Sequence, residues 1–381
     1  MRFHWFLPTS GDGRAITGGG HGLARRHGQT AASASRPPTI DYLAQVARAA
    51  EQAGFEAVLT PTGTYCEDAW LVTAALTQVT TRLKFLVAFR PGALSPTLAA
   101  QMAATYQRIS GGRLLLNVVT GGEAAEQRRF GDHLGKDERY ARTDEFLSIV
   151  RGAWDGPFDF RGNYYEVEGA TVAERPDPVP ELYFGGSSAA AGPVAARHVD
   201  VYLTWGEPPS QVAAKLDRMR ELAAAEGRTL RFGIRLHVIT RDTSKEAWAE
   251  AKRLLDQISP EDIASARAVL SRSESVGQQR MLALHEGYRG GSHGGSVRDL
   301  EIHPGLWAGV GLVRGGAGTA LVGSHAEVAD LVEEYASLGV EEFVLSGYPH
   351  LEEAFWFGEG VLPELRRRGL LGAPAPVRLS A

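Results

Sequence analysis

The chain has 381 residues, of which 44% are hydrophobic and 22% charged, as is typical of a globular protein with a sizeable core. Its net charge of −5, with no basic stripe to offset it, argues against a nucleic-acid-binding protein. Cys66 is the only cysteine, so no intramolecular disulfide can form, and no stretch approaches the roughly 18 apolar residues of a membrane span. We therefore expect a soluble cytoplasmic protein that binds neither nucleic acid nor membrane.

Short apolar runs alternate with amphipathic segments along most of the chain. The sequence predicts strands at 3–8, 56–61, 82–91, 113–121, 181–187, 199–207, 230–240 and 341–350. Helical spacing follows, most clearly at 39–53, 68–80, up to Ser110, 144–154 and 351–368. A hairpin at 158–169, turning near Gly162 and Asn163, interrupts the rhythm. Eight strands that are each followed by a helix predict an α/β fold, a (β/α)8 TIM barrel, as a single domain over 1–381.

Two long stretches do not fit a bare barrel. Residues 10–36 are rich in Gly, Ala, Ser and Arg and read as a loop insertion after the first strand. Residues 259–310 combine helical pieces with the glycine-rich run GYRGGSHGGSVRD, between the seventh and eighth strands. Both follow strands, so both are expected at the face where barrel active sites form. We interpret 259–310 as a mobile lid.

The seventh run, RFGIRLHVIT at 231–240, is amphipathic when extended. One face carries the apolar side chains Phe232, Ile234, Leu236 and Val238. In a barrel this face should meet the helices, so that Arg235 and His237 point into the barrel near its mouth. Cationic groups there need an anion or a dense hydrogen-bond network, because unpaired buried charge is costly. Pairing of Arg235 with a carboxylate of the barrel is the structural alternative.

Other polar residues gather where the predicted strands end. They are Cys66 after the second strand, Asn117 and Thr120 after the fourth, Ser187 and Ser188 after the fifth, Trp205 after the sixth, and Tyr348 and His350 after the eighth. Arg314 precedes two glycines, so the backbone there can approach a ligand closely. The GGSS run before a helix suits a phosphate. Structural explanations stay open, since GGSS can simply cap a helix, Cys66 can be a small core residue and Arg314 a solvated charge.

Several familiar catalytic motifs are absent from the sequence. It has no nucleotide-triphosphate loop, no G-x-G-x-x-G after a strand, no HExxH and no G-x-S-x-G. His285, His293 and His303 lack the tight spacing of metal ligands. We therefore expect no metal site and no ordinary dinucleotide-binding domain.

Taken together, the motifs resemble the bacterial luciferase-like flavin monooxygenases and, among them, the alkanesulfonate monooxygenases. The resemblance covers nearly the whole chain, through WFLPT, PTG..CEDAWLV, RLKFLVAFRPG, NVVTGG, ERY, LYFGGSS, YLTWGEPP, RFGIRLHVI, LWAGVGLVRGGAGTALVG and SGYPHLEEA. It implies that reduced FMN and O2 convert an alkanesulfonate into an aldehyde and sulfite. It also implies that a separate NAD(P)H-dependent FMN reductase supplies reduced FMN as a diffusible co-substrate, and that the protein is a homotetramer.

The resemblance also implies roles for individual residues. Arg235 and Arg314 would hold the sulfonate and stabilise the oxygenated flavin, while Cys66 would assist that stabilisation. His237 and Tyr348 would orient Arg314 and move protons. Trp205 and His350 would line the substrate site. The residues implied to contact the flavin, with the two serines at its phosphate, are Asn117, Thr120, Tyr140, Ser187, Ser188 and Trp205.

The chain departs from the family pattern near the predicted mouth. Ser10 stands where the family often has His, and Lys136 replaces a His before ERY. The insertions are also longer than usual, which leaves substrate size and shape open. Three alternatives follow: a monooxygenase of a sulfone or an amine, a deazaflavin-dependent dehydrogenase, and a flavin-binding protein without turnover. The pair Arg235 and Arg314 favours an anionic substrate over a sulfone or an amine, and a deazaflavin-dependent dehydrogenase would leave Cys66 and this pair without a purpose.

Overall fold

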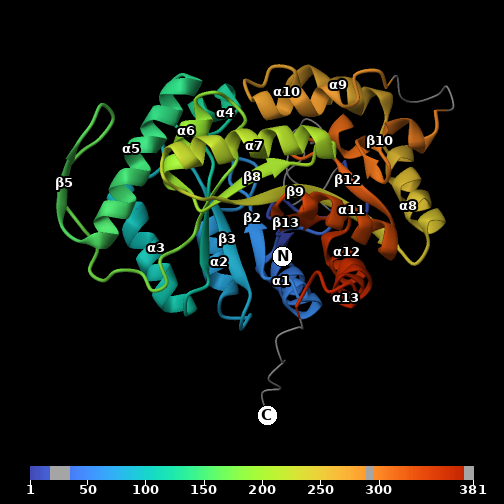
Figure 1. The fold of residues 1–381 in the computed structure, drawn as a ribbon, viewed down its shortest axis with the longest axis horizontal. Helices are drawn as coiled ribbons and strands as arrows, with labels where there is room; N and C mark the ends of the chain where they lie inside the picture. The colour runs from blue at the N-terminus through green and yellow to red at the C-terminus, as the bar shows by residue number, and fades with distance from the viewer. Residues whose placement is uncertain (18–34, 289–294, 373–381) are drawn as a thin grey trace, which may run out of the picture.

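The computed structural model describes residues 1–17, 35–288 and 295–372 (Figure 1). Much of the predicted 10–36 insertion and His293 lie outside these residues. Within the described part of the chain, no helix is both long and apolar enough to cross a membrane.

Eight parallel strands close into a barrel, because β9 pairs with β8 on one side and with β13 on the other. Their order around the barrel is β1 (Arg2–Phe6), β2 (Ala57–Thr60), β3 (Lys84–Phe89), β4 (Leu114–Val118), β7 (Leu182–Phe184), β8 (Val201–Trp205), β9 (Arg231–Arg241) and β13 (Val340–Ser346). Each contains part of one of the eight predicted strands. The predicted TIM barrel with insertions is confirmed.

Helices cover the outside of the barrel. They are α1 (Ile40–Ala53), α2 (Ala69–Leu76), α3 (Pro96–Ser110), α5 (Lys136–Asp155), α6 (Ala191–His198), α7 (Pro209–Ala225), α11 (His325–Ser337), α12 (His350–Trp356) and α13 (Leu362–Arg367). Two further helices are α4 (Ala124–Arg129), beside the loops after β2 and β3, and α8 (Ser244–Asp256), which packs on the second half of β9. The predicted helix at 351–368 is present, with a π-helical turn at Phe357–Val361 between α12 and α13. Gly358 lies there against α1, where a Cβ would lie only 2.8 Å from the Ala53 carbonyl oxygen.

The insertions add structure at the edges of the barrel. The predicted hairpin is confirmed as β5 (Phe158–Arg161) and β6 (Glu166–Ala170), and it projects sideways in Figure 1. Between α8 and α11 lie α9 (Pro260–Leu270), α10 (Val276–Ala283), β10 (Glu301–His303), β11 (Leu306–Trp307) and β12 (Ala320–Ser324), with 3-10 turns at Val297–Leu300 and Gly309–Leu312. Figure 1 shows α9 and α10 together above the barrel.

The strand β12 was not predicted. It pairs in parallel with the last five residues of β9, from Ala320 opposite His237 to Ser324 opposite Arg241. The eleven residues of β9 are more than the barrel needs, so its second half leaves the barrel and forms a small side sheet with β12, β11 and β10. The segment that carries Arg314 therefore approaches the barrel mouth along β9.

Two apolar layers support the mouth. The predicted apolar face of β9 packs in the large cluster between barrel and helices, which contains Phe232, Ile234, Leu236 and Val238. Inside the barrel a second cluster comprises Phe6, Ala57, Leu59, Leu86, Leu115, Tyr183, Val201, Leu203 and Val344. Phe6 is the last residue of β1, so it forms the upper end of this inner layer.

Candidate active site

Two arginine side chains meet over Phe6. The guanidinium carbon of Arg235 lies 4.8 Å from the centre of the Phe6 ring, and that of Arg314 lies 5.7 Å from it. Arg235 comes from β9 inside the barrel, and Arg314 comes from the loop before β12. Both side chains are buried, with 8% and 4% of their surfaces exposed. An aromatic face attracts cations but does not neutralise them.

A chain of hydrogen bonds joins Arg235 to the Arg314 loop. Arg235 donates to the Ser346 hydroxyl over 2.9 Å, and that hydroxyl lies 2.7 Å from Nδ1 of His237. On the other side of the ring, Nε2 of His237 lies 3.1 Å from the carbonyl oxygen of Ala317, three residues after Arg314. The carbonyl can only accept, so Nε2 carries the proton and Nδ1 accepts from Ser346. His237 thus ties the Arg314 loop to the barrel.

Tyr348 completes this cluster. Its hydroxyl accepts a short hydrogen bond from Arg314, and its ring stacks on His237 with centroids 5.5 Å apart. Burial raises the pKa of Tyr348, although Arg314 opposes the shift. Burial and the charge of Arg314 lower the pKa of Arg235 to about 9. Burial, then Arg235 and Arg314, lower the pKa of His237 well below its ordinary value.

Neither Arg235 nor Arg314 forms an ion pair with a carboxylate of the described residues, although 34 other such contacts join described residues of the chain. The structural alternative for Arg235, a barrel carboxylate as its partner, is therefore not found in this part of the chain. Two adjacent buried cations repel each other, and an anion bound between them would relieve that repulsion. The arrangement is suited to binding an anionic group.

Trp205 lies beside Arg235 and under the insertion. The two residues are register partners on β8 and β9, so their side chains leave the sheet on the same face. Gly277 of α10 packs so closely on the indole that a Cβ there would lie 3.0 Å from a ring carbon. The same helix holds the Arg314 loop, because the side-chain oxygen of Gln278 accepts from the backbone N–H of Gly316 over 2.9 Å. Helix α10 thus contacts both Trp205 and the Arg314 loop.

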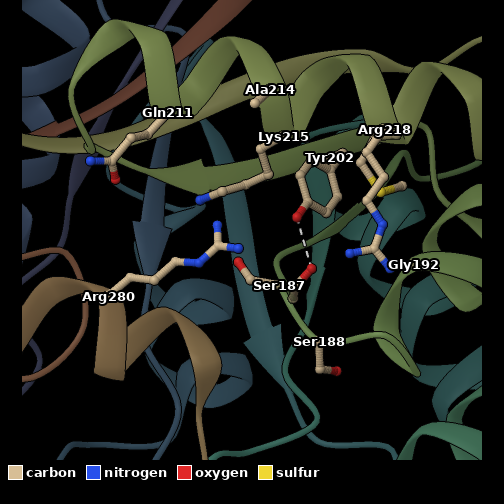
Figure 2. A pocket seen from close by; sticks show the side chains of 11 residues that line it. Ser187, Ser188, Gly192, Tyr202, Gln211, Ala214, Lys215, Arg218 and Arg280 are labelled. Carbon is tan, nitrogen blue, oxygen red and sulfur yellow. Dashed lines mark hydrogen bonds between the residues drawn. The ribbon is translucent and has the colours of Figure 1, made fainter. Parts of the chain in front are cut away.

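A polar pocket opens next to this region (Figure 2). Its lining includes the predicted Ser187 and Ser188, together with three basic residues that the sequence did not single out, Lys215, Arg218 and Arg280. Figure 2 shows Arg280 reaching from α10 towards Ser187, while Lys215 and Arg218 come from α7. Lys215 is already paired, since its ammonium lies 2.8 Å from a carboxylate oxygen of Glu207. Hydroxyls and guanidinium groups around one pocket suit a phosphate.

The loop of this pocket is fixed by two tyrosines. The hydroxyl of Tyr202 donates to the carbonyl of Gly186 over 2.7 Å. The hydroxyl of the predicted Tyr140, on α5, hydrogen-bonds with Ser188. Burial raises the pKa of both phenols, that of Tyr202 to about 12, so both remain protonated at neutral pH.

The other predicted residues lie along the same face of the barrel. Asn117 is half-buried in β4, and Thr120 is buried just beyond it, where its hydroxyl has no hydrogen-bond partner among the described residues. The thiol of Cys66, in the loop after β2, lies 3.5 Å from the carbonyl oxygen of Gly63. The next residue, Glu67, donates its backbone N–H to Thr9 over 3.0 Å, which links this loop to the one after β1.

His350 begins α12 next to a partner that the sequence did not reveal. Its Nδ1 lies 2.8 Å from Oδ1 of Asp12, and both side chains are fully buried. The Tyr42 hydroxyl donates to the other carboxylate oxygen over 2.5 Å. Asp12 belongs to the PTSGDG loop after β1, and 338 residues separate it from His350. The acidic residue beside two glycines was the only sequence signal, and it does not specify this pairing.

The chain is similar to a known protein family and to several solved structures. Residues 1–342 match the family model described as luciferase-like monooxygenase. A riboflavin lyase, solved with a modified FMN and riboflavin, is 23% identical with a TM-score of 0.78, over 98% of this chain and 94% of that one. A long-chain alkane monooxygenase is 22% identical with a TM-score of 0.76, over 97% and 92%. The protein DmoA from Hyphomicrobium sulfonivorans is 20% identical with a TM-score of 0.75, over 97% and 88%. At these identities the similarity shows a shared fold.

Proposed function

The chain belongs to the luciferase-like monooxygenase family, and we propose that it is a reduced-FMN-dependent alkanesulfonate monooxygenase. One observation favours an anionic substrate such as an alkanesulfonate. Arg235 and Arg314 lie buried over one aromatic ring, and no carboxylate of the described residues pairs with either. A sulfonate is a tetrahedral anion at every physiological pH, and guanidinium groups bind such oxygen anions through paired N–H donors.

The residues around the mouth fit FMN. The pocket at Ser187, Ser188 and Arg280 offers donors for a phosphate. The hydroxyl of Thr120, which has no partner among the described residues, offers one more polar contact. Gly277 and Arg280 are three residues apart, so α10 presents one face both to Trp205 and to this pocket. The cofactor, a diffusible co-substrate reduced by a separate NAD(P)H-dependent reductase, would supply the electrons that activate O2.

The proposed reaction balances without a further reagent. Alkanesulfonate, O2 and reduced FMN give aldehyde, sulfite, water, oxidised FMN and one proton. Of the four electrons that O2 accepts, two come from the flavin and two from the carbon that carries sulfur. One oxygen atom enters the aldehyde and the other leaves as water.

The chain's own residues would bind the substrate and exclude water. Arg235 and Arg314 hold the sulfonate, with Tyr348 fixing Arg314, while Trp205 and His350 line the space for the substrate carbons. The 259–310 segment acts as the lid, since its helix α10 already contacts both Trp205 and the Arg314 loop. We also propose that this single-domain protein assembles as a homotetramer.

The direct test is sulfite production. Protein and reduced FMN are mixed anaerobically, O2 is admitted with an alkanesulfonate from the C2–C8 series, and sulfite is measured. The proposal expects sulfite from at least one chain length, and no consumption of an alkyl amine or a sulfone of the same length. Tight flavin binding with no sulfite from any sulfonate would instead assign a flavin-binding protein or a different substrate.

A further inference from the structure

The proposed reaction must release a proton inside a covered site. The carbon next to sulfur starts with two hydrogens and ends as an aldehyde carbon with one. The second hydrogen leaves as a proton, because its bonding electrons go to the oxidant. Under a lid that excludes water, a side chain has to accept that proton.

His237 is poorly placed to accept it. Its Nε2–H donates to the Ala317 carbonyl, and its Nδ1 accepts from Ser346, so both ring nitrogens are occupied. Protonation would replace the Ser346 hydrogen bond with an added charge beside Arg235 and Arg314. The depressed pKa of His237 has this origin, after burial itself.

His350 has the opposite arrangement. Asp12 lies 2.8 Å from Nδ1, which assigns the ring proton of the neutral imidazole to Nδ1 and leaves the lone pair on Nε2. That Nε2 atom is buried and has no hydrogen-bond partner among the described residues. The ring faces the arginine cluster, with centroids 5.5 Å from the ring of Tyr348 and 5.6 Å from that of Phe6.

The surroundings of Asp12 favour the ionised form of its carboxylate. Tyr42 and the backbone N–H groups of Gly13 and His350 donate to its carboxylate at 2.5, 2.8 and 2.8 Å. Burial alone would raise the pKa of Asp12, but the attraction and hydrogen bond of His350, with those of Tyr42 and Gly13, hold it below its ordinary value. Behind Tyr42, Arg36 is neutralised by Glu352 at 2.6 Å. Among the described residues, Tyr348 also packs against the imidazole and His237 interacts with it electrostatically, and both belong to the cluster that contains Arg235 and Arg314.

We propose that Nε2 of His350 is the base that takes the proton from the substrate carbon, and that Asp12 is the positioning residue that fixes the imidazole tautomer and stabilises its cation. This inference rests on the proposed alkanesulfonate oxidation. It changes the predicted role of His350 from a wall of the substrate site to a catalytic residue, and that of His237 from proton transfer to anchoring the loop.

Two variants and a matched control test the proposed roles of His350 and Asp12. His350→Gln should lower kcat by about 100- to 1,000-fold, the usual contribution of a general base, and leave the calorimetric Kd for the sulfonate within about threefold. Asp12→Asn should lower kcat by at least about tenfold and move the acidic limb of its pH profile to lower pH, because the imidazole loses the anion that favours its protonation. His198→Gln is the control, because His198 is a buried histidine paired with Asp144 at 2.8 Å, at the other end of the barrel. It should leave kcat unchanged.

A second readout needs neither flavin nor turnover. In protein labelled with 15N-histidine, one imidazole should be a neutral Nδ1–H tautomer whose signals vanish in His350→Gln and change in Asp12→Asn. His198 provides an internal contrast, since its Nε2 faces Asp144 and must carry the proton there.

The outcomes separate the two proposals. Sulfite production by His350→Gln at the wild-type rate overturns the proton-transfer role and leaves the proposed function intact. An Nε2–H tautomer at His350, or an unmoved acidic limb in Asp12→Asn, overturns the role of Asp12. If the wild type makes no sulfite from any sulfonate, the proposed function fails, even where the Nδ1–H signal is present.

Discussion

Arg235 and Arg314 lie over the same ring, that of Phe6, at 4.8 and 5.7 Å, although they come from different segments of the chain. The barrel therefore places two buried positive charges side by side at its mouth, and their repulsion contributes to the lowered pKa of Arg235. Proteins tolerate such an arrangement when a bound anion compensates it.

Arg314→Ala should lower sulfite production by at least about 100-fold while the fold is retained. It removes one guanidinium from the substrate and leaves the Tyr348 hydroxyl without its donor. Loss of a charge-assisted hydrogen bond of about 3 kcal/mol corresponds to about a 100-fold or greater fall in kcat/KM. Steady-state sulfite assays and circular dichroism check this. Arg108→Ala, at an exposed surface pair with Glu174, is the control, and an active Arg314→Ala variant would remove Arg314 from the mechanism.

His237→Gln should make stability less sensitive to acid. In the folded state the pKa of His237 lies well below 6.5, so below that pH the unfolded chain binds a proton that the folded chain does not. Stability therefore falls as pH drops through this window, by up to about 1.4 kcal/mol per pH unit. Glutamine cannot titrate. The free energy of urea unfolding of the His237→Gln protein should therefore fall less steeply than that of the wild type between about pH 6.5 and 5. Parallel wild-type and variant curves would contradict the buried neutral imidazole.

Cys66→Ser should be mild, with at most about a tenfold fall in kcat/KM, because a hydroxyl can replace the thiol as a donor. The thiol lies 3.5 Å from the carbonyl oxygen of Gly63, a contact that serine can also make. Cys66→Ala, which removes the donor, should be the more damaging of the two. Complete loss of activity in Cys66→Ser would mean that the sulfur itself reacts.

Gly277→Leu should uncouple oxygen use from product formation. Even a Cβ at this position would meet the Trp205 ring at 3.0 Å, so a larger side chain must displace α10 and admit water. We expect sulfite per reduced FMN to fall by at least about half and hydrogen peroxide to rise. Gly287→Leu, where nothing lies within 4 Å of an added Cβ, is the matched control. Full coupling in Gly277→Leu would contradict the role of 259–310 as a lid.

Local patterns in the sequence predicted the barrel well. The strict alternation in RFGIRLHVIT placed Phe232 and Ile234 against the helices and Arg235 towards the mouth, because side chains in a strand alternate between its two faces. The same alternation continues beyond the barrel, so nothing local reveals where β9 leaves it. The strand β12, which pairs with that second half, was missed although ALVGS is apolar and precedes a helix.

The candidate site was predicted only in part, because its remaining contacts join residues far apart in the chain. Arg235, Arg314, His237 and Tyr348 come together in the structure. Asp12 was not expected beside His350, and Arg280 was not expected beside Ser187, since each pairing depends on how a loop or an inserted helix folds back. Such contacts have no local periodicity from which to predict them.

The most direct test of the account is calorimetric titration of the anaerobic protein, loaded with reduced FMN, with three ligands of equal chain length: an alkanesulfonate, an alkyl amine and an uncharged methyl sulfone. If Arg235 and Arg314 form an anion site, the sulfonate should bind at least about 100-fold more tightly than the other two, from about 3 kcal/mol of charge-assisted hydrogen bonding. This preference should disappear in Arg235→Ala and in Arg314→Ala. Equal or tighter binding of the amine or the sulfone by the wild type would contradict an anion site at the arginine pair.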